Sequence, residues 1–314
     1  MKENQLSRYG AIAKALPPTL GKIFFVVHGE DSFAGDLLHE FPVDKDGVPR
    51  VYVTTTSADT DNLAIQAALD ACVASRNDYV LVAPSNNDND IAATLTMSKR
   101  DVHLIGMDFL SNKQDVGSNS ATKIHQVGAY HLTTLTGGNC EIAGFYFKNY
   151  NNKATIMSTG AVCDCPHIHH NHFNLNGTTT EGVPAIDFAS SSSSFVLIEK
   201  NSFASNVSDL TFSSIISISS SCTWAKVMGN SLICADGCTW TVGILNSSYK
   251  GQTCGNTVAA ITGAGADGTV TTAFQTTGGI CNDNRANVAN TADFTCDGTY
   301  DELANYSHAI NHYS

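Results

Sequence analysis

The sequence predicts an all-β protein, a right-handed parallel β-helix with a helical cap near its N-terminus. Two observations support this prediction. Asparagine recurs at spacings of 30, 29, 26 and 28 residues in the second half of the chain, at positions 171, 201, 230, 256 and 284. One amphipathic helical pattern precedes a series of short apolar segments, and no second helical pattern follows it. Repeats of about 20 to 50 residues are typical of stacked supersecondary units, so each repeat is predicted to form one coil of a solenoid.

The composition restricts the class of protein. Of the 314 residues, 42% are hydrophobic and only 15% are charged, which is too apolar for a disordered chain. No uninterrupted apolar run is long enough for a transmembrane helix. Ser, Thr and Asn together account for 86 residues, so neutral polar side chains are expected to cover the surface. The net charge of −12 argues against binding to nucleic acid or to an anionic membrane surface.

Ten cysteines are present, and the N-terminus lacks the unbroken apolar core of a signal peptide. The thiols are therefore expected to be mostly reduced and interior. The pairs Cys163 with Cys165 and Cys234 with Cys238 are an alternative zinc site, but the typical CxxC…CxxC spacing is absent. Small buried apolar side chains are the better interpretation.

Charge is distributed unevenly, with 26 Asp, Glu, Lys and Arg residues in the first 120 positions and 20 in the remaining 194. This indicates a compositional boundary near residue 120. We predict four regions: an N-terminal arm and attachment region over 1–56, a capping helix with the first coils over 57–120, the main β-helix over 121–296, and a C-terminal cap or assembly segment over 297–314.

Short runs of β-branched and aromatic residues predict strands over 21–27 and 50–54, and the acidic stretch between them, which contains Gly and Pro, is expected to be a loop. A helix is predicted within 60–76, with Thr60 or Asp61 as N-cap and Asn77 as its stop. Its apolar positions at helical spacing are Ile65, Ala68, Leu69, Cys72 and Val73.

The predicted helix would cover the open first coil of a solenoid, where core and sheet edge otherwise face water. An ordinary α/β unit is the alternative, but no further helical pattern follows to form a second crossover. Short strands are expected instead in the segments DYVLVAPS, IAATLTMS and DVHLIGMD.

The asparagine repeat explains part of the composition. An Asn amide both donates and accepts hydrogen bonds, which suits a tight bend between strands, so a ladder of Asn side chains is predicted along the solenoid. After the first three asparagines a polar residue is followed by Phe173, Phe203 or Leu232. The earlier segment CEIAGFYF is aligned with Gly144 in the Asn position. Further strands are expected in AIDFAS, SSIISISS and WTVGIL.

The segment TDNLAIQAALDACVASRNDYVLVAPS, followed by coils punctuated with Asn, resembles the pectate-lyase-like right-handed parallel β-helix superfamily. The resemblance covers residues 57–290. The opening LSRYG…GKIFFV…FPVDKDGVPRVYVT is similar to β-helical proteins carried by tailed bacteriophages. The first resemblance implies a fold without a particular activity, and the second implies a virion protein, with trimerisation expected from other phage β-helices.

Catalytic residues are not assigned. Pectate elimination, as the superfamily implies it, requires carboxylates for calcium and a basic residue, and the predicted solenoid has one arginine, Arg285, and no match to the catalytic motifs. A glycosidase needs two carboxylates about 5 to 9.5 Å apart. Asp209, Asp236 and Asp267 are spaced so that they could stack on neighbouring coils, but their turn-like settings favour capping of the backbone.

The motif HIHHNH contains His167, His169, His170 and His172. In a strand, His167 and His169 share a face and can bind a transition metal if a neighbouring coil adds a carboxylate or a third histidine. His125 and His131 lie upstream, but no third ligand is identified. The motif is therefore interpreted as an exposed or interchain polar face, and no metal or cofactor is assigned.

These observations favour a non-enzymatic structural protein of a tailed-phage virion. The expected form is a homotrimeric capsid decoration protein or head fibre on the capsid exterior, with the major capsid protein or another virion protein as partner. The alternative is a tailspike-like β-helix that binds or degrades a host surface polysaccharide. Trp224 and Trp240 are the only tryptophans, which is weak support for a sugar-stacking track.

Overall fold

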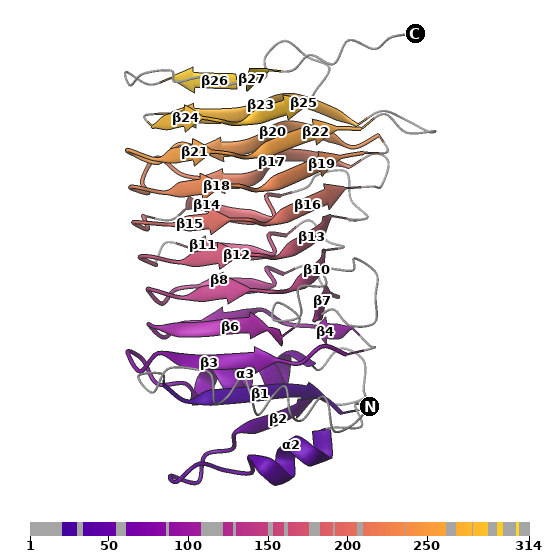
Figure 1. The fold of residues 1–314 in the computed structure, drawn as a ribbon, viewed down its shortest axis with the longest axis vertical. Helices are drawn as coiled ribbons and strands as arrows, with labels where there is room; N and C mark the ends of the chain where they lie inside the picture. Colours follow the sequence, from indigo (N-terminus) through magenta and orange to yellow (C-terminus); the bar gives the residue numbers. More distant parts are fainter. Residues whose placement is uncertain are drawn as a thin grey trace.

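Three parallel β-sheets run the length of the chain in the computed structural model shown in Figure 1. From β3 to β26, neighbouring strands within a sheet are three apart in their order along the chain, so each coil adds one strand to each sheet. The result is a right-handed β-solenoid of about seven turns, which confirms the predicted fold class.

The structure describes residues 21–29, 34–54, 61–85, 88–107, 122–127, 130–149, 153–159, 163–175, 183–190, 192–205, 210–235, 237–261, 268–277, 279–287, 294–297 and 306–307. The arm expected over residues 1–20 lies outside them. In these ranges no helix is long and apolar enough to cross a membrane.

The sheets are named in the order in which each coil visits them. The first sheet contains β2 (Val51–Thr54), β1 (Ile23–His28), β3 (Asp78–Val82), β6 (Val102–Gly106), β9 (Glu141–Ala143), β12 (His167–His169), β15 (Leu197–Glu199), β18 (Lys226–Met228), β21 (Gln252–Cys254) and β24 (Ile280–Asn282). The second contains β4 (Asn89–Ile91), β7 (Lys123–Gln126), β10 (Tyr146–Asn149), β13 (His172–Leu175), β16 (Ser202–Ser205), β19 (Ser231–Cys234), β22 (Thr257–Ala260), β25 (Arg285–Asn287) and β27 (Tyr306–Ser307). The third contains β5 (Leu95–Met97), β8 (Thr133–Leu135), β11 (Ile156–Thr159), β14 (Ile186–Ser190), β17 (Thr211–Ile218), β20 (Thr239–Asn246), β23 (Thr269–Thr277) and β26 (Phe294–Asp297).

Helix α3 (Asp61–Ala71) is the predicted cap. Its buried face, formed by Ile65, Ala68 and Leu69, joins the solenoid core, and Figure 1 places the helix at the N-terminal end of the coils. The prediction that Val73 packs on this face is wrong: the helix ends at Ala71, and Val73 is 49% exposed. No helix follows α3 among the described residues, so the α/β alternative is excluded.

The ends of α3 differ from the sequence prediction in detail. Asp61 is its first residue and accepts the backbone N–H of Asp90 at 2.7 Å, which ties the helix to β4. Thr60, the other predicted N-cap, lies outside the described residues. Asn77 has a φ of 64°, a left-handed conformation that Asn tolerates, and the chain turns there into β3.

The loop expected between the first two strands contains a helix, α2 (Ala34–Glu40), so that prediction is wrong. Leu37 of α2 is fully buried in a second cluster with Phe25 and Val27 of β1, on the opposite face of the strand from the main core. Burial on both faces explains the continuous apolar run of β1. The seven residues of α2 contain too few apolar positions to show a helical period in the sequence.

Asp44, between α2 and β2, anchors the N-terminal region. It forms an ion pair with Lys22, and its Oδ1 accepts the backbone N–H groups of Asp46 at 2.8 Å and Val48 at 3.0 Å. The hydrogen bond from Lys22 outweighs the effect of burial and, together with these N–H groups, lowers the pKa of Asp44 to about 2. Ionised Asp44 is therefore stabilised in the folded state.

We expect Asp44→Asn to make thermal stability less sensitive to acid. The folded-state pKa of Asp44 lies below the unfolded value of about 3.9, so its contribution is present above about pH 4 and is lost as the pH falls towards 2. Asparagine keeps an acceptor for the two N–H groups but does not titrate. The midpoint of thermal unfolding is measured for both proteins above and below this pH range. The midpoint should decrease less on acidification for the variant than for the wild type. Equal decreases would contradict the assignment.

The predicted asparagine ladder is confirmed. The five asparagines are buried at the bend between the first and second sheets, and the Nδ2 of each of the first four donates to the Oδ1 of the next Asn at 2.9 to 3.1 Å. Each Nδ2 also donates to a backbone carbonyl on the preceding coil, and each Oδ1 from Asn201 to Asn284 accepts the backbone N–H of the previous Asn. These contacts satisfy polar groups that the bend would otherwise bury without partners.

The alignment of Gly144 with the ladder is wrong by one residue. Because Ala143 pairs with His169, Phe145 occupies the position of Asn171, and its backbone N–H donates to Asn171 Oδ1 at 3.1 Å. Gly144 instead belongs to the preceding position, which has positive φ in six successive coils. The members of this column are Gly144, His170, Lys200, Gly229, Gly255 and Asp283.

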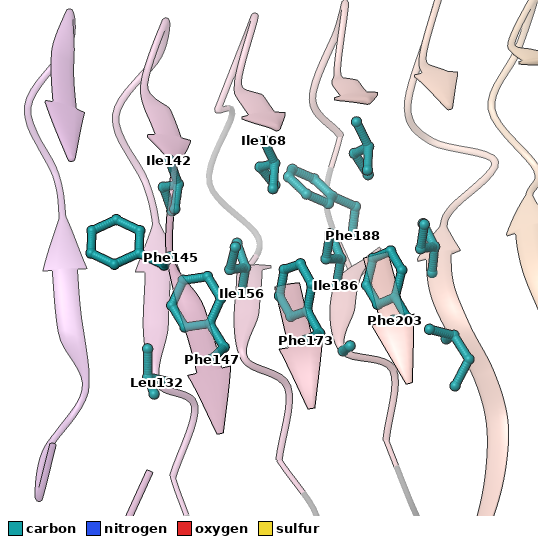
Figure 2. Close-up of a cluster of buried hydrophobic side chains, with 14 of the residues drawn as sticks. Leu132, Ile142, Phe145, Phe147, Ile156, Ile168, Phe173, Ile186, Phe188 and Phe203 are labelled. Atoms are coloured by element: carbon teal, nitrogen blue, oxygen red, sulfur yellow. The ribbon is translucent and has the colours of Figure 1, made fainter. Parts of the chain in front are cut away.

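The residues after the ladder form a column of inward-facing side chains in the second sheet, as predicted. Phe147, Phe173 and Phe203 stack with centroid separations of 5.1 and 4.6 Å (Figure 2). Leu232 pairs with Phe203 and continues the column on the next coil. Ile186 and Phe188 of β14, in the predicted segment AIDFAS, face the same interior from the third sheet. The core therefore consists of columns of side chains that stack from coil to coil along the inner faces of the sheets.

The C-terminal region continues two sheets. β26 pairs with β23 of the third sheet, and β27 pairs with β25 of the second. The other residues of 297–314, for which a cap or assembly segment is predicted, lie outside the described ranges.

Candidate functional site

The outer face of the first sheet carries a group of histidine and glutamate side chains. Ile142 of β9 and Ile168 of β12 are fully buried and face the core (Figure 2). Because side chains alternate along a strand, the neighbouring Glu141, His167 and His169 lie on the outer face. His167 is directly opposite Glu141, and His169 follows two residues later on the same strand.

These three residues, with His103 of β6 and Glu199 of β15, are called the histidine–glutamate cluster. Glu141 lies at its centre, because Oε2 is 2.6 Å from His103 Nδ1 and Oε1 is 2.7 Å from His169 Nε2. His167 Nε2 is 3.1 Å from Glu199 Oε1, and the rings of His167 and His169 stack at 3.9 Å. The cluster therefore joins side chains from four successive strands of the sheet.

Neighbouring residues hold the cluster in place. His103 Nε2 is 2.6 Å from Asn77 Oδ1, and the His103 ring stacks on Tyr79 at 4.2 Å. The side chain of His169 is only 8% exposed and that of Glu141 is 22% exposed. The two central side chains are thus shielded, although they lie on an outer face of the solenoid.

The electrostatics favour an ionised carboxylate beside neutral imidazole. Burial alone would raise the pKa of Glu141, but hydrogen bonds from His103 and His169 outweigh it and lower the pKa to about 2. Burial, reinforced by the neighbouring His169, lowers the pKa of His167 despite its contact with Glu199. An ionised carboxylate and a neutral imidazole are the forms in which these groups bind metal ions.

The structure supplies the third ligand that sequence reasoning did not identify. One candidate ligand atom from each of Glu141, His167 and His169 lies within 4.8 Å of the others, the one such group of three or more His, Cys, Asp or Glu residues in the described ranges. The interpretation of the motif as a polar face stays a prediction, and the structure adds a carboxylate beside its two histidines.

The other histidines considered in the sequence analysis lie outside this cluster. His125 lies on β7 of the second sheet, 2.8 Å from Asp90, and His131 precedes β8 of the third. His172 faces outward on the second sheet, where it contacts Ser202 at 2.6 Å. His170 lies at the bend between β12 of the first sheet and β13 of the second. It contacts His169 at 2.7 Å, at the edge of the cluster.

A second candidate surface lies at the corner that leads into the first sheet. One residue per coil has a φ between 54° and 64° there, in a column formed by Asn77, Asp101, Asn139, Cys165, Phe195, Trp224 and Lys250. Bulky side chains rarely adopt this conformation, whereas Asn and Gly do so readily. Phe195 and Trp224 are nevertheless present, and they are 57% and 44% exposed.

These aromatic side chains form a continuous strip, here called the aromatic row. The rings of Phe195 and Trp224 are nearly parallel, at 9°, with centroids 6.5 Å apart. Lys250 Nζ lies 4.8 Å from the centroid of Trp224 and 5.3 Å from that of Tyr249, which is itself 58% exposed. Trp240, the other tryptophan, is fully buried on β20 and belongs to the core.

The remaining sequence candidates are not brought into a site. Asp209, Asp236 and Asp267 all lie outside the described residues, and Arg285 is exposed on β25.

Cys163 is buried and Cys165 is exposed, whereas Cys234 and Cys238 are both buried. Burial raises the pKa of Cys234 to about 12, which is typical of an interior thiol. Seven of the nine cysteines whose side chains the structure describes are buried, which agrees with the predicted interior location of most thiols.

Comparison of the chain with protein-family models, curated proteins and solved structures gives no match. The functional assignment therefore depends on the geometry of the fold and on these two surfaces.

Proposed function

We propose that this protein is a non-enzymatic structural component of a tailed-phage virion, a capsid decoration protein or head fibre that stands on the capsid exterior as a homotrimer. Its partner would be the major capsid protein or another virion protein. The observation that carries this proposal is the continuous stack of coils, joined by a ladder of buried asparagines from Asn171 to Asn284.

A continuous stack of this kind suits a rigid element on the exterior of a particle. Successive coils are held together by three parallel sheets, by the ladder from Asn171 to Asn284 and by the aromatic column from Phe147 to Phe203, so the solenoid resists bending between coils. The surface is rich in neutral Ser, Thr and Asn, which suits a soluble exterior. Placement in a virion rests on the resemblance of the opening segment to β-helical phage proteins that was noted from the sequence, since the comparisons supply no relative.

The proposal is tested in particles of a phage that encodes this chain. Quantitative mass spectrometry should find the protein in purified virions at a copy number comparable with that of the capsid protein. Sedimentation of the purified protein should give a trimer. Absence from the particles would overturn the virion assignment, and a monomer that stays monomeric on the particle would overturn the trimer.

A second candidate function, binding of a host surface polysaccharide as in a tailspike, is favoured by the aromatic row. Aromatic side chains there occupy left-handed backbone positions that Asn or Gly would adopt with less strain, which points to a role beyond the fold. Sugar rings stack their apolar faces on exposed aromatic rings, and adjacent coils present Phe195 and Trp224 in parallel.

If the aromatic row binds polysaccharide, Trp224→Ala is expected to weaken binding at least about tenfold, or ~1.4 kcal/mol. Isothermal titration calorimetry with host surface polysaccharide compares the two affinities, and in the wild type binding should also change the emission of the half-exposed Trp224, whereas the buried Trp240 should report little. Ile261→Ala is a matched control, since Ile261 is 44% exposed, as Trp224 is, and follows β22 of the second sheet. Equal affinity of Trp224→Ala and wild type would exclude the aromatic row as the polysaccharide-binding surface. Release of reducing ends or unsaturated products from the polysaccharide would overturn the non-enzymatic assignment.

A further inference from the structure

We propose that Glu141, His167 and His169 bind one divalent transition-metal ion on the outer face of the first sheet. The inference is independent of the structural role proposed above. It depends on the geometry of the histidine–glutamate cluster, in which a ligand atom from each of the three side chains lies within 4.8 Å of the other two.

The backbone places these side chains with little freedom. β9 and β12 are neighbours in register, with His167 opposite Glu141 and His169 opposite Ala143. Ile142 and Ile168, between the outward residues, are locked in the core at 0% exposure. The register therefore holds two imidazoles and one carboxylate on adjacent coils before any ion binds, which lowers the conformational cost of binding.

The distances suit a small ion. Zinc lies about 2.0 to 2.2 Å from imidazole nitrogen and carboxylate oxygen, so tetrahedral ligand atoms are about 3.3 to 3.5 Å apart. Small rotations of the three side chains can bring their ligand atoms from within 4.8 Å to that separation. The 2.7 Å hydrogen bond between His169 Nε2 and Glu141 Oε1 would be replaced by two bonds to the ion.

Two further side chains supply the outer partners that metal ligands need. His103 Nδ1 is 2.6 Å from Glu141 Oε2, the oxygen that does not contact His169, and Glu199 Oε1 is 3.1 Å from His167 Nε2. Hydrogen bonds of this kind orient ligating carboxylates and imidazoles. With Glu199 on Nε2, His167 would ligate through Nδ1.

The donor set selects the class of ion. Two imidazoles and one carboxylate suit Zn²⁺, Co²⁺, Ni²⁺ or Cu²⁺, whereas Ca²⁺ and Mg²⁺ prefer oxygen ligands only. Three protein ligands leave a fourth position for water or for a group from another molecule. Because the ligands belong to adjacent coils, the ion would also join β9 to β12, and binding to the folded state alone should raise thermal stability.

The test uses untagged full-length protein that is stripped with EDTA and titrated with ZnCl₂ near neutral pH. Calorimetry should show one Zn²⁺ per chain, and Co²⁺ should give visible absorption bands of low-symmetry nitrogen and oxygen coordination. Glu141→Gln and His169→Ala should each weaken Zn²⁺ binding at least about 100-fold. His103→Gln, which removes only an outer partner, should weaken it by roughly 10-fold.

His125→Ala is the matched control, because His125 also contacts a carboxylate, that of Asp90 at 2.8 Å, but belongs to no group of three ligands in the described ranges. This variant should bind Zn²⁺ as wild type does. The proposal is overturned if wild type shows no saturable binding, or if Glu141→Gln keeps wild-type affinity. Should one ligand variant fail to fold by circular dichroism, His167→Ala provides the same comparison from the facing strand.

Discussion

Replacing Asn201 with alanine is expected to lower the free energy of unfolding by about 3 to 5 kcal/mol. In the folded protein, Asn201 Nδ2 donates to the carbonyl of Ile168 at 3.0 Å, and Oδ1 accepts the backbone N–H of Asn171 at 3.0 Å. Both backbone groups are inside the bend, and each would lose its partner at a cost of about 1 to 3 kcal/mol. The amide groups of Asn171 and Asn230 would also lose a contact.

Urea unfolding followed by circular dichroism measures this loss. Asn174→Ala is the matched control, because Asn174 is half-buried on the outer face of β13 and, among the described residues, its amide donates only to Tyr146 Oη, at 2.8 Å. Its removal is expected to cost within about 1 kcal/mol. If the two variants were equally stable, the ladder would contribute no more than an ordinary side-chain hydrogen bond.

Phe173→Ala is the second large expected effect, also about 3 to 5 kcal/mol. Phe173 is fully buried between Phe147 and Phe203, with its ring 5.1 Å from the first and 4.6 Å from the second. Each neighbouring ring is held by its own strand at the spacing of the sheet, so the walls of the void cannot close. The lost transfer free energy and the cavity therefore both contribute to the decrease.

The control for this substitution is Phe195→Ala, which removes the same side chain from a position 57% exposed to solvent. It should change the free energy of unfolding by only about 0.5 kcal/mol. The same urea titration compares the two. A cost below about 1 kcal/mol for Phe173→Ala would mean that the column relaxes around the void.

Much of the fold is predictable from the sequence because its signals are local and repeated. The asparagines and the apolar residues that follow them recur once per coil, and each recurrence marks the same bend and the same inward column. Helix α3 is predictable from the spacing of Ile65, Ala68 and Leu69. Helix α2 is not, because it buries chiefly Leu37 against a sheet face that no local pattern reveals.

The candidate site was hidden by a shift of one residue. Aligning Gly144 with Asn171 places Glu141 opposite Ile168, which faces the core, whereas the observed register places it opposite His167 on the outer face. Side chains alternate along a strand, so a slip of one position exchanges the two faces. The signal that finds the register is the residue with positive φ before each asparagine, a position that Gly144 shares with Gly229 and Gly255.

His103 and the aromatic row were missed for a different reason. Contacts between coils join residues 38 apart, as in His103 with Glu141, because insertions between strands vary the length of the coil. A fixed period cannot align such positions. The corner column of left-handed residues becomes visible only when φ is known, since its seven members are of six residue types.

The asparagine ladder also gives the solenoid an electrical direction. From Asn171 to Asn256, one N–H of each amide donates towards the C-terminal end and the other towards the preceding coil, whereas each Oδ1 accepts from the N-terminal side, so the side-chain carbonyls all point the same way along the axis. Hydrogen bonds in such a chain polarise one another, which makes the central members stronger than the terminal ones. The two ends of the rod are therefore inequivalent in their polarity as well as in their shape.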